Sequence, residues 1–436
     1  MIPGSDDFVV TGGRGFEVRL DSLEQAAAAL SVSSASLSNA EYALYSMRLS
    51  AEAGSCGASS TAVQLDQESL RLEARARRAV DECLGAAASV RQAATAYANE
   101  ESRRASAADG LQNLLIGSSA VPAFLRLLGA KGIGRDLDLS PESDGRTLAR
   151  ALRAREQGHI EGSPKDLLVG PRVQVAAGNG DPSTYSYALR SLRQAQGHEE
   201  LDDGTTVPPS SILVERFTRA DGSVAVMVTV PGTQTWALDS ADGNLFDTEG
   251  ILDGLASRES QTRALIQQAL ADQNLGENAE VVFNCYSQGG IQVFGLLEDE
   301  EFRARHRVAA VTAVGSPVSA FDLPAEVPVL SLTNADDIVP AASGRQVEPS
   351  GALVNVRSPS RFDPIAKAQY PQVVVAQAHD LGNYARDAAT LDSSGSPAVL
   401  EHSGSIGAAL GAGSAASRER FVYTGTDTRT NPGPKP

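Results

Sequence analysis

The chain has 436 residues, of which 42% are hydrophobic, and it carries a formal net charge of −17 at pH 7. That length suits one large or two to three ordinary domains, and the apolar fraction is enough for a sizeable core. The negative charge argues against nucleic acid and anionic membrane surfaces as electrostatic partners.

The first 20 residues predict an irregular or short β lead-in. Residues 1–7 are acidic and lack the basic and apolar parts of a secretory signal peptide, and no later stretch approaches the ~20 apolar residues of a membrane span. The three cysteines, Cys56, Cys83 and Cys285, show neither a disulfide framework nor a metal-ligand spacing. We therefore expect no metal or other cofactor, and either a cytoplasmic location or export without a signal peptide.

Residues 21–105 predict an antiparallel helical hairpin. Asp21 and Glu24 form a capping-box-like start, and small residues at 54–57 separate the two helices. The first helix carries a leucine every seven residues, at Leu23, Leu30, Leu37 and Leu44. The facing stripe of the second helix is expected at Leu65, Leu72, Ala76, Val80, Cys83, Ala87, Val90, Ala94 and Tyr97. Heptad spacing makes a seam for a partner helix.

This hairpin resembles the small helical proteins of the WXG100 and related families, which type VII secretion exports from Gram-positive bacteria. Residues 97–101 (Tyr-Ala-Asn-Glu-Glu) are similar to the Tyr-x-x-x-Asp/Glu export pattern, but residues 55–57 read Ser-Cys-Gly where those families have Trp-x-Gly. The resemblance implies an export signal or docking to a secretion partner, and hence a secreted or cell-envelope protein. The residues alone equally allow a coiled coil for dimerisation or for packing on another domain.

Residues 106–183 predict a helical and irregular connector, with an arginine-rich helix around 145–156. Gly178 and Gly180 follow a short apolar run in a Gly-x-Gly pattern. Without a third glycine and a following helix, the pattern predicts a plain turn and not a phosphate-binding loop.

Residues 184–390 predict an α/β domain with a mostly parallel central sheet, because continuous apolar runs alternate with helical patterns. Strands are expected at 212–217, 224–230, 281–284, 308–314, 327–332 and 353–356. Helices are expected at 185–196, 259–273, 288–305 and from 379. Residues 391–436, rich in Ser, Gly and Ala, predict a flexible tail or exposed cover with a late edge strand at 420–424.

A sharp turn at 285–290 (Cys-Tyr-Ser-Gln-Gly-Gly) stands between a predicted strand and a predicted helix. A serine at the apex with small residues two before and two and three after it is the pattern of a nucleophile elbow. Cys285 takes a place where glycine is usual. A serine hydroxyl needs a base, an acid that orients the base, and donors for the oxyanion. Ser287 is the candidate nucleophile.

The acid and the base are expected further along the chain. Asp337 follows the strand at 327–332, which brings a carboxylate to the same edge of a parallel sheet as Ser287. His379 precedes the last predicted helix. The order Ser, Asp, His is that of α/β-hydrolases.

The oxyanion donors are expected on either side of the nucleophile. One is the amide of Gln288, directly after the serine, and the other is the amide of Thr233, after the strand at 224–230. The hydroxyl of Thr233 is a third candidate. Trp236 and Tyr286 are the expected substrate-binding side chains, although Trp236 also suits plain packing.

The elbow and the acid segment carry a resemblance to known hydrolases. Residues 286–289 (Tyr-Ser-Gln-Gly) resemble the elbow of cutinases and of the related PE-PPE hydrolase domains. Residues 334–340 (Asn-Ala-Asp-Asp-Ile-Val-Pro) are similar to the Asn-Asp-x-Val-Pro segment of class 3 (fungal-type) lipases. That resemblance gives the role of the acid to Asp337 and not to Asp336.

Residues 231–234 resemble the oxyanion strand end of the same lipases, and His379 with Tyr384 resembles their histidine-containing C-terminal segment. The resemblance covers about 212–390. It implies an α/β-hydrolase fold, preceded here by the all-α hairpin, and a serine esterase or lipase that acts on an ester or lipid-like substrate through an acyl-enzyme without a cofactor.

Alternatives remain for residues and for function. Cys285 is a poor nucleophile candidate, because its side chain should point into the sheet. The other histidines, His159, His198, His306 and His402, lie before the sheet, in a charged helix or in the predicted tail. The alternative function is a type VII-secreted interaction protein whose hydrolase-like domain is a scaffold without catalysis.

Overall fold

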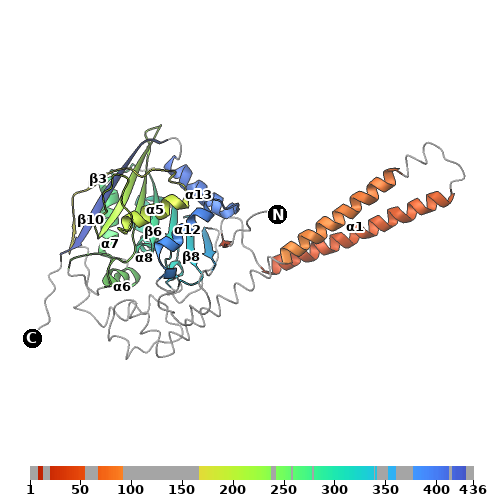
Figure 1. Cartoon of the computed structure of the whole chain (residues 1–436), viewed down its shortest axis with the longest axis horizontal. Coiled ribbons are helices and arrows are strands. Elements are labelled where there is room, and N and C mark those ends of the chain that lie inside the picture. The colour runs from red at the N-terminus through yellow and green to blue at the C-terminus, as the bar shows by residue number, and fades with distance from the viewer. Residues whose placement is uncertain are drawn as a thin grey trace, which may run out of the picture. The chain divides into compact units, whose positions relative to one another are not determined.

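The computed structural model describes residues 8–12, 20–54, 67–91, 166–236, 242–256, 259–276, 279–337, 339–340, 352–359, 377–411 and 415–428. The chain divides into two compact units (Figure 1). One is Val18–Ala107, and the other combines Met1–Glu17 with Ala108–Pro436. The short N-terminal segment before the helices thus groups with the sheet.

The helical unit is an antiparallel hairpin, as the sequence predicts. Its first helix is α1 (Leu20–Gly54), and the second spans 67–91. Arg77 Nε donates to Glu41 Oε1 at 2.7 Å, and Arg91 Nη2 donates to Ser31 Oγ at 2.7 Å. Because the later residue of the second helix pairs with the earlier residue of the first, the helices run in opposite directions.

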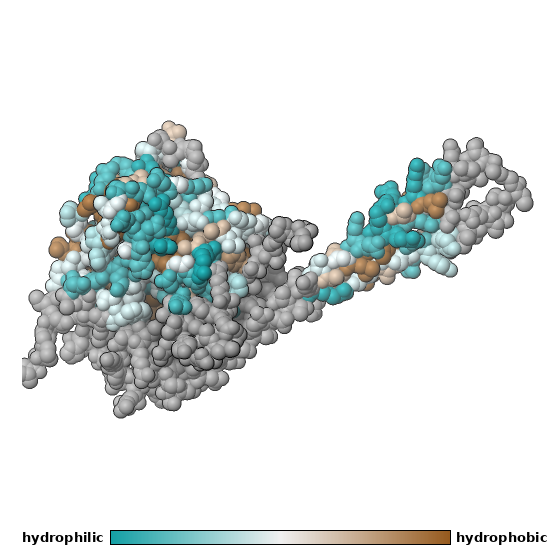
Figure 2. Space-filling model, in the orientation of Figure 1, coloured by the Kyte–Doolittle hydropathy of each residue, from teal (hydrophilic) through white to brown (hydrophobic). Residues whose placement is uncertain are grey.

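The seam of the hairpin follows a heptad spacing. Its covered positions in α1 include Ala27, Leu30, Ser34, Leu37, Glu41 and Leu44, and those in 67–91 include Ser69, Glu73, Ala76, Val80, Cys83, Ala87 and Val90. The prediction is wrong at Leu72, which is 45% exposed, whereas Glu73 is 7% exposed. Hydrophobicity favours the leucine, but the three-four spacing of the seam places its neighbour Glu73 at the covered position. Figure 2 shows apolar side chains among hydrophilic ones on the hairpin surface.

The side chains of Leu23, Leu65, Ala94 and Tyr97 lie outside the described part of the chain, as do Cys56 and the export-like segment at 97–101. So do residues 106–165 of the predicted connector. None of the described helices is long and apolar enough to cross a membrane.

The described residues of the other unit contain a ten-stranded mixed sheet in the order β1-β9-β8-β7-β6-β5-β4-β10-β2, with β3 also paired to β10. The strands are β1 (Val9–Gly12), β2 (Leu167–Val169), β3 (Val173–Val175), β4 (Ser211–Arg219), β5 (Val224–Val230), β6 (Glu280–Tyr286), β7 (Arg307–Val314), β8 (Val329–Asn334), β9 (Leu353–Ser358) and β10 (Ala415–Asp427). From β5 to β9 all neighbours are parallel. Their carboxyl ends therefore meet at one edge of the sheet.

Helices cover both faces of this sheet. On one face lie α6 (Thr248–Ala256), α7 (Gln261–Asp272), α8 (Gln288–Glu298), α9 (Glu300–Arg305) and the short η3 (Val318–Ala320). On the other lie α5 (Tyr185–Ala195), α12 (Leu381–Leu391) and α13 (Pro397–Leu410) (Figure 1). Burial on both sides explains why the parallel strands read as continuous apolar runs. The helix predicted at 288–305 is divided into two at Asp299, which leaves the helical conformation and caps α9.

The C-terminal prediction needs correction. Of the two alternatives, a flexible tail or an exposed cover, the structure favours the cover, because α13 packs on the sheet. The strand predicted at the edge is not at an edge, since β10 lies between β4 and the pair β2 and β3. The small residues of α13 allow close packing, with Ala398, Val399, Ile406 and Ala409 buried. Composition alone suggested flexibility because Ser, Gly and Ala are frequent in linkers as well.

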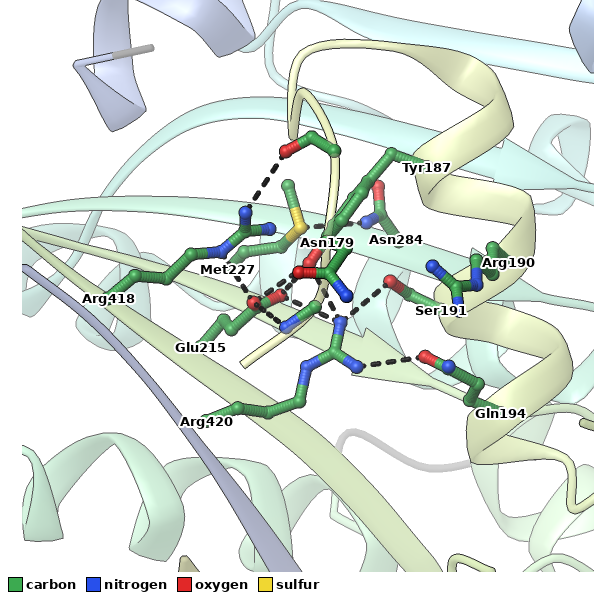
Figure 3. Close-up of polar contacts among 12 residues, drawn as sticks. Asn179, Tyr187, Arg190, Ser191, Gln194, Glu215, Met227, Asn284, Arg418 and Arg420 are labelled. Carbon is green, nitrogen blue, oxygen red and sulfur yellow. Dashed lines mark hydrogen bonds and ion pairs between the residues drawn. The ribbon is translucent and has the colours of Figure 1, made fainter. Parts of the chain in front are cut away.

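Residues 178–180 form an irregular loop with a bend at Gly180, where the sequence predicts a turn, and the loop lies on a buried ion-pair cluster (Figure 3). The amide of Gly178 donates to Glu215 Oε1 at 3.2 Å, and the amide of Asn179 donates to Asp202 Oδ2 at 2.8 Å. Carboxylates thus occupy the amides that a phosphate would need. A Cβ at position 178 would lie 2.2 Å from the Tyr187 hydroxyl oxygen and 2.5 Å from Arg420 Nη2, so any larger residue would displace these side chains.

Candidate active site

Ser287 stands at the turn between β6 and α8 with φ 51° and ψ −117°. A positive φ is rare for a residue with a side chain and marks strain held in place by its surroundings. The amide of Ser287 donates to the carbonyl of Val314 at 2.9 Å. A Cβ on Gly289 would collide with the carbonyl oxygen of Val230, and one on Gly290 would collide with a nearby serine side chain. The glycines after the serine are therefore required by close packing.

Ser287, His379 and Asp337 form a hydrogen-bonded series, here called the triad. His379 Nε2 lies 2.8 Å from Ser287 Oγ, and His379 Nδ1 lies 2.7 Å from Asp337 Oδ2. The carboxylate accepts only, so Nδ1 carries the proton and Nε2 is left to accept from the serine hydroxyl. Asp337, and not Asp336, is the carboxylate in contact with the histidine.

The carboxylate of Asp337 is fully buried and held by two further donors. The amide of Val339 donates to Oδ1 at 2.9 Å, and the hydroxyl of Tyr384 donates to Oδ2 at 2.6 Å. Burial, and next the charge of Asp337, raises the pKa of Tyr384 well above its usual range, so this hydroxyl stays a donor. The sequence offered Tyr384 only through its position five residues after His379, without this role.

Gly315 leaves room for the histidine and the carboxylate. It follows β7 with φ 57°, and a Cβ there would lie 3.1 Å from His379 Cε1 and 3.2 Å from Asp337 Oδ2. Both the positive φ and the crowding favour glycine at this position.

Tyr286 lies elsewhere than predicted. It is 8% exposed, and its ring stacks on that of His379 with centroids 5.0 Å apart. Its hydroxyl donates to the backbone carbonyl of His379. The side chain therefore supports the histidine from the protein side and does not face a substrate. Trp236 is 45% exposed, and its substrate-binding role stays a prediction.

The amides of Thr233 and Gln288 lie beside the nucleophile. Thr233 follows Gly232, where a Cβ would lie 3.0 Å from the Cβ of Ser287. No acceptor for either amide is found among the residues that the structure describes. Two unpaired N–H groups at a helix start and an adjoining loop suit a developing oxyanion. The Thr233 hydroxyl donates to Gln288 Oε1 at 3.1 Å, so it is not a third free donor here.

Cys285, His306 and His402 do not contact Ser287, and His159 lies outside the described residues. Cys285 is fully buried and its thiol points to the carbonyl of Thr312 at 3.7 Å. Burial raises the pKa of this thiol, which keeps it protonated and unreactive at neutral pH. His402 is a buried residue of α13, and His306 is the C-cap of α9. Within the described ranges, no group of three or more His, Cys, Asp or Glu is arranged to bind a metal.

The chain matches no protein-family model, no curated protein and no solved structure. What the site does must follow from its own chemistry. A histidine that accepts from a strained serine and donates to a buried carboxylate can take up and return one proton. The amides of Thr233 and Gln288, for which the described residues offer no acceptor, adjoin this serine.

Proposed function

We propose that the protein is a serine hydrolase of the α/β-hydrolase class that cleaves carboxylic esters. The observation that carries this proposal is the hydrogen-bonded series from Ser287 through His379 to Asp337, with the serine held at a positive φ. Such a conformation costs of the order of 1–3 kcal/mol. Ser210, just before β4, has a positive φ as well, so the hydrogen-bonded series carries the proposal and the conformation only supports it.

The proposed reaction proceeds through an acyl-enzyme. Ser287 Oγ attacks the ester carbonyl while His379 Nε2 takes its proton, and the amides of Thr233 and Gln288 bind the oxyanion. His379 then gives the proton to the leaving alcohol, and water releases the acid by the same steps. Asp337 keeps the Nδ1 proton in place and stabilises the charged ring throughout. No cofactor takes part.

A fluorophosphonate probe, which reacts with activated serines, tests the proposal. We expect the wild type to be labelled at one site, with labelling and hydrolysis of p-nitrophenyl butyrate both lost in Ser287→Ala. Ser316→Ala is a matched control, since Ser316 is a buried serine close to the elbow whose hydroxyl only donates to the carbonyl of Val314. A folded wild type that is neither labelled nor active would favour the scaffold alternative.

The substrate class is proposed as lipid-like, on the resemblance to cutinases and class 3 lipases. A series of p-nitrophenyl esters of increasing acyl length measures this preference. A rise of kcat/KM with chain length supports a lipid-like acyl group, and a maximum at acetate argues for a small ester instead.

For the hairpin we propose a role in export or partner docking, which would make the protein secreted or envelope-bound. It is supported by the division of the chain into two units. Because β1 pairs with β9 of the sheet, the suitable deletion replaces 18–107 with a short linker and retains the first 17 residues. Loss from the culture supernatant with hydrolysis retained in the cell extract is the expected result. Secretion of the deleted protein would contradict an export role.

A further inference from the structure

The loop that carries the Thr233 amide runs very close to the nucleophile. A Cβ on Gly232 would lie 2.6 Å from Tyr286 Cδ1 and 3.0 Å from the Cβ of Ser287, so only glycine fits. Glycine also has the greatest backbone freedom of any residue. The loop therefore needs hydrogen bonds from another segment of the chain if the Thr233 N–H is to keep a fixed orientation.

The side chain of Gln196 makes two such hydrogen bonds. Its Oε1 accepts from the amide of Gly232 at 2.9 Å, and its Nε2 donates to the carbonyl of Thr233 at 3.0 Å. Gln196 is half-buried and caps the C-terminus of α5, and its own amide bonds to the last turn of that helix. One planar amide, fixed to a helix, thus holds two backbone groups of the loop at once.

The two groups that Gln196 binds lie on either side of the peptide unit that contains the Thr233 N–H. Fixing both limits rotation of that unit about its axis, while the Thr233 N–H itself has no acceptor among the described residues. The neighbouring hydroxyl of Thr233 adds a link to Gln288 at 3.1 Å, which ties the loop to the start of α8.

We propose that Gln196 is a positioning residue that aims the Thr233 amide at the oxyanion, which rests on the proposed hydrolase function. Its side chain touches neither substrate nor nucleophile and acts through the loop. Removing one oxyanion donor lowers kcat by about 10²- to 10³-fold in other serine hydrolases. Loosening a donor that stays present should cost less, about ten- to a hundredfold.

The test compares Gln196→Met with Gln194→Met, using p-nitrophenyl butyrate. Methionine has a similar length but makes neither hydrogen bond. Gln194 lies two residues earlier in α5, is buried, and binds Glu200 and Arg420 away from the loop. We expect Gln196→Met to lower kcat about ten- to a hundredfold with KM within about threefold, and to slow fluorophosphonate labelling by a similar factor. The control should lose thermal stability but keep kcat.

Two results would overturn the inference while the proposed function stands. One is an active wild type whose kcat stays within about twofold in Gln196→Met. The other is an equal fall of kcat in Gln194→Met, which would mean that any damage to α5 has the same effect. A wild type that is neither labelled nor active overturns the proposed function, and this inference with it.

Discussion

Two buried polar clusters of the sheet-containing unit, the triad and the cluster around Glu215, have opposite properties. In the triad, the serine oxygen and two nearby amides have capacity for a further hydrogen bond. In the Glu215 cluster, made of Tyr187, Glu215, Arg418 and Arg420, the carboxylate accepts from the other three side chains at 2.6–3.0 Å and from the Gly178 amide at 3.2 Å (Figure 3). Burial and charge are common to both clusters, so they do not distinguish a site from a structural core.

What distinguishes the clusters is proton transfer and location. Arginine does not give up its proton at any physiological pH, so the Glu215 cluster cannot relay one, whereas a histidine can. The charged residues of the Glu215 cluster lie on β4 and β10, in the antiparallel part of the sheet, and Tyr187 reaches them from α5. The triad lies at the carboxyl ends of parallel strands, where ligands of open α/β sheets usually bind.

The largest effect is expected at the triad carboxylate. Asp337→Asn should lower kcat for p-nitrophenyl butyrate by about 10⁴-fold, because the amide no longer holds His379 in the tautomer that accepts from Ser287. The fold should persist, since asparagine keeps the shape and part of the hydrogen bonding.

Asp336→Asn is the matched control, because it changes the adjacent carboxylate, which does not contact the histidine. We expect its kcat within about threefold of wild type. Equal losses in the two variants would contradict the triad and would point to a general effect of charge in this segment.

The parallel strands and the triad were predictable because their signals are local. Apolar runs mark buried strands, and a nucleophile elbow is recognised from a few consecutive residues, a serine among small ones between a strand and a helix. The end of β8 in a parallel sheet then brings Asp337 to the edge that holds Ser287, and His379 lies in the connection between β9 and α12 at the same edge.

Other features were not predictable, because they depend on contacts between distant segments. Gln196 reads as an ordinary helix-end residue until the loop at Gly232 lies against it. The position of Tyr286 next to the serine favours a contact with substrate. Side chains alternate between the two faces along β6, however, and Tyr286 points to the face covered by α5 and α12, where its ring stacks on His379. In the hairpin, Glu73 occupies a seam position that its charge argues against.

A smaller effect, on stability in place of catalysis, is expected at the other cluster. Glu215→Gln leaves two arginines without their carboxylate and should lower the free energy of unfolding by about 3–5 kcal/mol. Urea unfolding followed by the fluorescence of Trp236 measures it, since this only tryptophan lies in the sheet-containing unit. The kcat of the protein that remains folded should not change.

Glu199→Gln is the control for that experiment. Glu199 pairs with Arg190 and Arg193 at 3.0 and 3.3 Å but is 32% exposed, so its loss should cost about 0–1 kcal/mol. A fall of kcat in Glu215→Gln without loss of stability would contradict the contrast between the clusters, because it would make the Glu215 cluster part of the catalytic apparatus.

The smallest effect concerns a second buried histidine, His402, and it appears only as a dependence on pH. Its ring lies between the hydroxyl of Tyr185 at 3.1 Å and the carbonyl of Val311 at 3.0 Å, and no carboxylate of the described residues is hydrogen-bonded to either nitrogen. Burial lowers its pKa to about 4 from an ordinary value of 6.5. Between these values the unfolded chain binds a proton that the folded chain does not. The free energy of unfolding therefore decreases as the pH falls from 6.5 towards 4, by up to about 1.4 kcal/mol per pH unit and about 3 kcal/mol in all.

The variant His402→Gln tests this dependence on pH. Glutamine keeps a donor and an acceptor but cannot titrate, so the free energy of unfolding of the variant should fall less steeply over this range. If the free energies of unfolding of wild type and variant fall in parallel with pH, the pKa of His402 is not lowered by folding.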